Sequence, residues 1–103
     1  MNSGEQPIGG ILKSRYNKDR DLKYNFGISI YAYEDMFEKQ GGVCAICQLP
    51  ETSRHNNVIK MLAVDHDHST GEIRGLLCSN CNTALGLFGD NKETLKAAIK
   101  YLK

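Results

Sequence analysis

The sequence has no long apolar run, no large excess of charge of either sign and no unpaired cysteine. None of its 103 residues belong to an apolar stretch of the roughly 20 positions that a membrane-spanning helix requires, and no secretory signal opens the chain. We therefore expect a cytoplasmic protein. Charged residues make up 24% and hydrophobic residues 41%, which excludes a disordered chain and is typical of a globular one.

The length predicts one small domain with a modest core. We place this domain at residues 13–103, after a flexible tail over residues 1–12. The net charge of +1 is unevenly distributed: residues 1–25 and 90–103 each carry +2, and residues 26–89 carry −3. A centre that binds cations between flanks that face phosphates would show this pattern. Ordinary solvated helix faces would show it too, so both interpretations stay open.

All four cysteines occur in pairs with two residues between the partners, CAIC at 44–47 and CSNC at 78–81. Disulfides are one interpretation, but a reducing cytoplasm disfavours them. Two such pairs can instead supply four thiolates to one tetrahedral ion. We predict a structural zinc site with four ligands: Cys44, Cys47, Cys78 and Cys81.

Sequence periodicity predicts two helices before the first cysteine pair. A basic, polar run over residues 13–26 favours a helix that Gly27 ends. Ser29 is a candidate N-cap for a second helix, whose apolar positions recur at helical spacing until the glycines at 41–42.

The centre of the chain has the pattern of a β-hairpin followed by a short helix. Residues 61–68 and 73–77 favour strands, and residues 69–72 favour the turn between them. Residues 82–87 suit a short helix, whereas residues 51–57, which include His55, have loop composition.

A capping-box pattern at residues 90–93 predicts a last helix, beginning at Asp90. Its apolar face contains Leu95, Ala98, Ile99 and Leu102. These elements together predict an α+β fold with helices on either side of a zinc-bound hairpin.

The segment VDHDH at 64–68 and the asparagine after the last cysteine carry the chemistry of a hydrolytic site. Asp65 and Asn82 offer the hard oxygen ligands that Mg²⁺ or Mn²⁺ prefers. His66 could accept a proton from an attacking water, since histidine titrates near neutral pH. Adjacent residues of a regular strand point to opposite faces, so Asp65 and His66 can serve one site only if the strand ends, twists or bulges there.

The chain resembles the phage recombination endonuclease VII family, within the HNH or His-Me finger nucleases. The resemblance rests on CAIC at 44–47, LAVDHDH at 62–68 and IRGLLCSNCN at 73–82, and it covers roughly residues 20–90. It implies a ββα-metal core, DNA as substrate and a phage or prophage protein in a bacterial host. It also implies structural zinc on the four cysteines and a catalytic Mg²⁺ or Mn²⁺ on Asp65 and Asn82.

In the same family pattern His66 is the general base, and His68 matches a second histidine that contacts the scissile phosphate or the leaving group. Asp67 has no catalytic counterpart, so we expect a structural role for it. Arg74 could contact a phosphate or form a surface ion pair. The chain departs from the pattern at Leu85, where the best-studied member has a glutamate, and in a C-terminal region with no counterpart here. Both departures favour a nicking or double-strand-cleaving nuclease over a Holliday-junction resolvase.

Two other interpretations stay open. A non-catalytic zinc module that binds DNA or protein would explain the cysteines and the basic flanks. A second zinc ion on Asp65, His66 and His68 would instead make a small-substrate metallohydrolase. If DNA is the substrate, contacts mainly with phosphates are expected, from residues 13–24 and 91–103. A homodimer would allow both strands to be cut at once.

Overall fold

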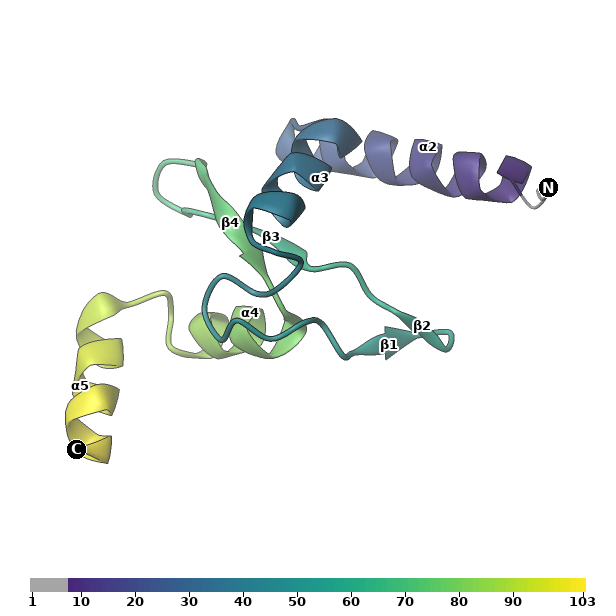
Figure 1. Cartoon of the computed structure of the whole chain (residues 1–103). Helices are drawn as coiled ribbons and strands as arrows, with labels where there is room; N and C mark the ends of the chain where they lie inside the picture. The colour runs from purple at the N-terminus through teal and green to yellow at the C-terminus, as the bar shows by residue number, and fades with distance from the viewer. Residues whose placement is uncertain (1–7) are drawn as a thin grey trace. The chain divides into compact units, whose positions relative to one another are not determined.

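The computed structural model describes the backbone of residues 8–103, and the first seven residues of the expected tail lie outside this range. The chain divides into two compact units between Lys39 and Gln40. Residues 8–103 form four helices and two small antiparallel sheets (Figure 1), which confirms the predicted mixture of helix and sheet. No helix in this described part is both long and apolar enough to cross a bilayer.

The first unit contains helix α2, Ile8–Phe26, and helix α3, Ile30–Lys39. Helix α2 begins before the predicted residue 13, so residues 8–12 are also helical. It ends as predicted at Gly27, which has φ of +71° and donates its N–H to the Lys23 carbonyl at 3.0 Å. Ser29 is confirmed as the N-cap of α3, because its hydroxyl accepts the Ala32 N–H at 3.1 Å.

In the second unit, the segment predicted as a loop contains a two-stranded ribbon. Strand β1, Arg54–His55, pairs with strand β2, Val58–Ile59. Asn56 and Asn57 connect them with φ of 52° and 65°, the left-handed geometry of a tight hairpin turn. The loop prediction was wrong here because two adjacent asparagines, which tolerate this geometry, are themselves a hairpin signal.

The central hairpin is confirmed, with strand β3, Ala63–His66, paired to strand β4, Ile73–Leu77 (Figure 1). Strand β3 is shorter at both ends than the predicted 61–68. The turn after it is built by Asp67, whose carboxylate accepts the backbone N–H groups of Ser69 and Thr70 at 2.7 and 3.3 Å. Asp67 therefore has a structural role, as expected.

The hairpin core is apolar and continuous with the first cysteine pair. Leu62, Val64, Leu76 and Leu77 are buried, as is Cys44. The Ala45 N–H donates to the Leu76 carbonyl at 3.0 Å, which attaches the cysteine segment to β4. A small core of this kind gains much from a metal that ties its segments together.

Helix α4, Ser79–Leu87, follows β4 directly and contacts both β3 and β4 (Figure 1). It begins three residues before the predicted residue 82, because Cys78 is its N-cap. The Cys78 sulfur accepts the Cys81 N–H at 3.4 Å. The second cysteine pair thus forms the first turn of α4 rather than preceding it.

Helix α5, Lys92–Leu102, is capped one residue later than the capping-box pattern indicated. Its N-cap is Asn91, whose side chain accepts the Thr94 N–H at 3.0 Å. Asp90 is therefore not the cap, and its carboxylate is available to other partners. The predicted apolar face forms, although Ile99 and Leu102 on it are largely exposed.

Candidate functional site: a four-cysteine cluster beside an acidic and histidine-bearing hairpin

The four cysteines converge as predicted. Their sulfur atoms all lie within 4.8 Å of one another, and none forms a disulfide. The sulfurs of Cys47 and Cys78 are 3.8 Å apart. Thiolates bound tetrahedrally to zinc at about 2.3 Å are roughly 3.8 Å from one another, and the Cys47–Cys78 distance matches this spacing.

Electrostatics within the cluster also favour a bound cation. Burial would raise the pKa of Cys44, but the backbone N–H groups of Cys78, Cys47 and Ile46 outweigh it and lower this pKa to about 6. Burial and the neighbouring thiols raise the pKa of Cys81 to about 12. One thiolate forms readily, whereas further negative charge is opposed unless a cation shares it. The cluster could therefore hold a structural zinc ion.

Glu51 joins the first cysteine segment to the start of helix α4. It is buried, with 8% of its surface exposed. One carboxylate oxygen accepts the N–H and the hydroxyl of Ser79 at 2.8 and 3.1 Å, and the other accepts the N–H groups of Thr52 and Ser53. Burial would raise the pKa of Glu51, but these hydrogen bonds outweigh it and place the pKa below its ordinary value.

The hairpin has the irregularity that a shared site for Asp65 and His66 requires. Asp65 pairs with Gly75, but His66 pairs with Ile73, so Arg74 has no opposite residue in the ladder. An extra residue of this kind bends the strands and changes the direction of the side chains beside it.

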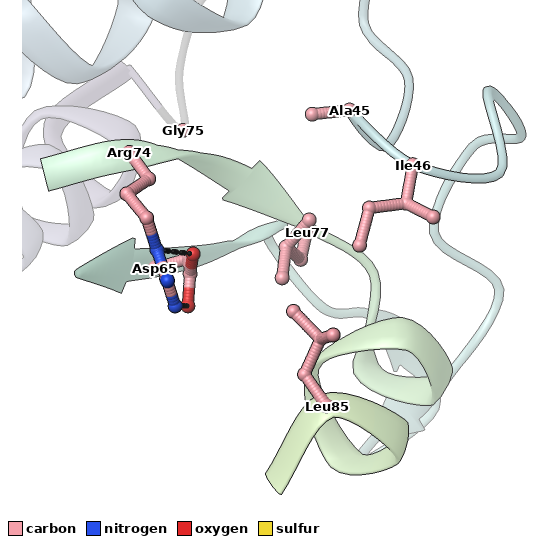
Figure 2. A pocket seen from close by; sticks show the side chains of 7 residues that line it. All are labelled: Ala45, Ile46, Asp65, Arg74, Gly75, Leu77 and Leu85. Carbon is pink, nitrogen blue, oxygen red and sulfur yellow. Dashed lines mark hydrogen bonds and ion pairs between the residues drawn. The ribbon is translucent and has the colours of Figure 1, made fainter. Parts of the chain in front are cut away.

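Arg74, the unopposed residue, binds both oxygens of Asp65. Its Nε is 2.8 Å from Asp65 Oδ2 and its Nη2 is 3.2 Å from Oδ1, a bidentate ion pair visible in Figure 2. The same Nη2 lies 2.9 Å from Asp90 Oδ1. The ion-pair interpretation of Arg74 is thus confirmed, with two acidic partners rather than one.

Asp90 extends these contacts to the histidines. Its Oδ2 is 3.8 Å from His68 Nδ1, and the ring centroids of His68 and His66 are 5.0 Å apart in an edge-to-face arrangement. A continuous series of contacts therefore runs from Asp65 through Arg74, Asp90 and His68 to His66. Hydrogen bonds to both carboxylates raise the pKa of Arg74, and the guanidinium holds the pKa of Asp90 below its ordinary value.

An open hollow of about 250 Å³ lies between the hairpin, the first cysteine segment and α4. Asp65, Arg74 and Leu85 line it, and Figure 2 shows Leu85 projecting from α4 toward the hairpin. Asn82 is three residues before Leu85 and so shares its face of the helix, although Asn82 does not itself line the hollow.

The structure thus brings Asp65, His66 and His68 into one network and places Asn82 on a helix that contacts the same hairpin. Sequence reasoning missed Asp90, whose only signal was its position after the glycine that ends a helix. The second zinc site considered for Asp65, His66 and His68 has no geometric support. Within the described residues, the cysteine cluster is the one group of three or more His, Cys, Asp or Glu with ligand atoms this close together.

The fold and the site place this chain among small α+β domains with a potential metal site. It combines a cluster of four cysteine sulfurs that could bind a metal with a hairpin that carries acidic residues and histidines, and a helix follows the hairpin. The sequence profile of recombination endonuclease VII matches residues 19–103. The chain therefore belongs to the recombination endonuclease VII family.

Two curated relatives are phage proteins. The chain is 48% identical over 79 residues to the Gene 59 protein of Mycobacterium phage D29, covering 76% of this chain and 45% of that protein. It is 49% identical over 78 residues to the Gene 59 protein of Mycobacterium phage L5, covering 75% and 44%. The chain thus spans less than half the length of these relatives. No solved structure matches it.

Proposed function

We propose that this chain is a metal-dependent DNA endonuclease of the HNH type, in which strands β3 and β4 and helix α4 form a ββα-metal, or His-Me finger, core. Its family membership supports hydrolysis of phosphodiester bonds. The consecutive order and mutual contacts of β3, β4 and α4 support the core assignment. Relatives encoded by phages support a role in the cytoplasm of a bacterial host.

In this proposal Asp65 and Asn82 hold one Mg²⁺ or Mn²⁺. The Asp65 side chain is 13% exposed and already binds a cationic group, the Arg74 guanidinium, so its surroundings suit positive charge. A divalent cation bound there would polarise the phosphodiester and stabilise the oxygen that leaves. Asn82 adds a neutral amide oxygen, which contributes a ligand without further negative charge.

His66 is the proposed general base, and it accepts the proton of the attacking water. The single observation that carries this assignment is the register irregularity between Asp65 and His66. An irregular ladder allows neighbouring residues to depart from strict alternation, which supports a shared site, and the contacts through Asp90 and His68 connect the two side chains. His68, with 72% of its side chain exposed, is accessible to contact the substrate phosphate.

The four-cysteine zinc site has a structural role in this proposal. It holds the segment before the hairpin against the first turn of α4, and so fixes Asn82, the residue after Cys81, relative to β3. DNA would be bound mainly through its phosphates. Two copies of the chain would be required to cut both strands in one encounter.

Cleavage of supercoiled plasmid by the zinc-loaded protein tests the function. We expect nicked or linear product with Mg²⁺ or Mn²⁺ and none with EDTA, and we expect His66→Ala to reduce the rate by about 100-fold or more. His55→Ala is the matched control, since His55 lies on the exposed β1–β2 ribbon.

Equal loss of activity in both histidine variants would contradict the assigned base. If the folded wild type cleaves neither plasmid nor a four-way junction in the presence of metal, the nuclease proposal is wrong and a binding module is the remaining function. Cleavage of the junction alone would identify a resolvase. The ratio of nicked to linear plasmid shows whether the two cuts are coupled.

A further inference from the structure

Arg74 and the proposed catalytic cation compete for the same carboxylate. Both Asp65 oxygens accept hydrogen bonds from the guanidinium, at 2.8 and 3.2 Å (Figure 2). A divalent ion can bind Asp65 only if Arg74 releases at least one oxygen. A guanidinium that is released with no other partner would remain as an unpaired positive charge beside the ion, and the two would repel each other.

Asp90 provides that other partner. It already accepts Arg74 Nη2 at 2.9 Å, slightly closer than the contact between the same nitrogen and Asp65. The Asp90 carboxylate is partly shielded, with 25% of the side chain exposed, so water screens this ion pair less than it would a fully exposed one.

The backbone at the end of α4 directs Asp90 toward the hairpin. Gly89 and Asp90 both have left-handed geometry, with φ of 68° and 56°. The Gly89 N–H donates to the Gly86 carbonyl at 2.9 Å, and the Asp90 N–H donates to the Leu85 carbonyl at 2.8 Å, which closes the helix end. Aspartate and asparagine tolerate this conformation better than most side chains, so both can occupy the position without changing the turn.

We propose that Asp90 is a positioning residue that retains the Arg74 guanidinium when Asp65 exchanges it for a divalent cation. The inference rests on the proposed function, because it assigns the cation to Asp65. The charges of the three side chains show the direction of the effect. Two carboxylates and one guanidinium leave a net charge of −1 to attract the ion. Asp90→Asn leaves zero, with Arg74 directed to Asp65 alone, whereas Arg74→Gln leaves −2 and an unoccupied Asp65.

A Mn²⁺-binding experiment on the zinc-loaded protein, without DNA and at physiological salt, tests the proposal directly. The electron paramagnetic resonance signal of free Mn²⁺ measures how much of the ion is bound. We expect Asp90→Asn to weaken binding about tenfold and Arg74→Gln to tighten it several-fold. Asp65→Asn, which removes the proposed ligand, should abolish binding. Zinc content and melting temperature, measured for each variant, identify any loss that comes from misfolding instead.

The double variant distinguishes positioning from direct coordination. If Asp90 acts mainly through Arg74, adding Asp90→Asn to Arg74→Gln should weaken Mn²⁺ binding clearly less than the tenfold loss in the wild-type background, because only the loss of one nearby negative charge remains; the two substitutions are then non-additive. An equal tenfold loss in both backgrounds would show that Asp90 acts on the ion directly, as a ligand or as a charge, and would overturn the proposal. Unchanged affinity in the Asp90→Asn single variant would also overturn it.

Failure of the proposed function has a different signature. If Asp65→Asn leaves Mn²⁺ binding intact, the cation does not bind Asp65, and both the catalytic assignment and the role of Asp90 are wrong. If Asp65→Asn abolishes binding while Asp90→Asn has no effect, the metal assignment stands and the positioning role alone is rejected.

Discussion

The carboxylate of Glu51 accepts two hydrogen bonds from Ser79, one from the backbone N–H at 2.8 Å and one from the hydroxyl at 3.1 Å, across 28 positions of sequence. Ser79 is the first residue of α4, where a negative charge is favourable because the helix dipole is positive at that end. Cys81 and Asn82 follow in the same turn. Glu51 therefore orients a proposed zinc ligand and a proposed catalytic-metal ligand together.

Replacing this carboxylate should destabilise the protein without removing a metal ligand. We expect Glu51→Gln to lower the free energy of unfolding by about 2 kcal/mol, the magnitude of a lost helix cap combined with weakened charged hydrogen bonds. Urea unfolding of the zinc-loaded protein measures the effect. Glu72→Gln, at an exposed carboxylate, is the matched control and should be near neutral. Equal effects in the two variants would show that the buried hydrogen bonds contribute nothing.

The contribution of Glu51 should depend on pH in a defined direction. Its pKa is lower in the folded protein than in the unfolded chain, so the carboxylate stabilises the fold above the unfolded pKa. That contribution is lost as the pH falls through the folded value. The stability difference between wild type and Glu51→Gln should therefore be largest near neutral pH and shrink in acid. Both proteins share the cysteine ligands, whose pH dependence cancels in the difference; a difference independent of pH would contradict this account.

Metal analysis should find one tightly bound zinc ion per chain. Removal of zinc with a strong chelator should unfold residues 40–103, because the four thiols link the segment before the hairpin to helix α4. Elemental analysis combined with circular dichroism checks both statements. Two zinc ions per chain would instead support the metallohydrolase alternative, and a stable metal-free fold would show that the core needs no such link.

Asn82 should influence cation binding, whereas its neighbour two residues earlier should not. We expect Asn82→Ala to raise the Mg²⁺ concentration for half-maximal cleavage by about 10- to 100-fold, the range found when groups that tune a metal site are removed. Asn80→Ala is the control, since Asn80 is an exposed asparagine in the same helical turn. A similar change in both variants would point to a disturbed helix rather than a missing ligand.

DNA binding should depend on salt through the basic residues of the N-terminal helix. Replacing four of them together should weaken binding and lower the slope of log affinity against log salt by about one unit for each phosphate that is no longer neutralised. These residues are Lys13, Arg15, Lys18 and Arg20. The same experiment on Lys92, Lys96 and Lys100 of α5 compares the second candidate surface. An unchanged slope would exclude the surface concerned.

The ends of helices could be predicted to within a residue from the sequence where they depend only on neighbouring residues. Ser29 caps a helix and Gly27 ends one through contacts within a single turn. The thiol convergence was also predictable, because the ligand chemistry of paired cysteines constrains the fold. The start of α4 was predicted too late, because Cys78, which is not a typical N-cap residue, caps the helix and because Glu51, which is distant in sequence, binds its first residue Ser79.

The amino-acid sequence alone specifies which reactive groups the chain carries: four thiols, the Asp65–His66 pair and the asparagine after the last cysteine. How these groups are connected depends on contacts between segments that are distant in the sequence. Arg74 has no opposite residue in the β3–β4 ladder because of the way these two strands pair. The Arg74–Asp90 ion pair forms because the turn that ends α4 brings Asp90 to Arg74. Local patterns specify turns, caps and periodicity, whereas contacts between distant segments depend on how the whole core packs.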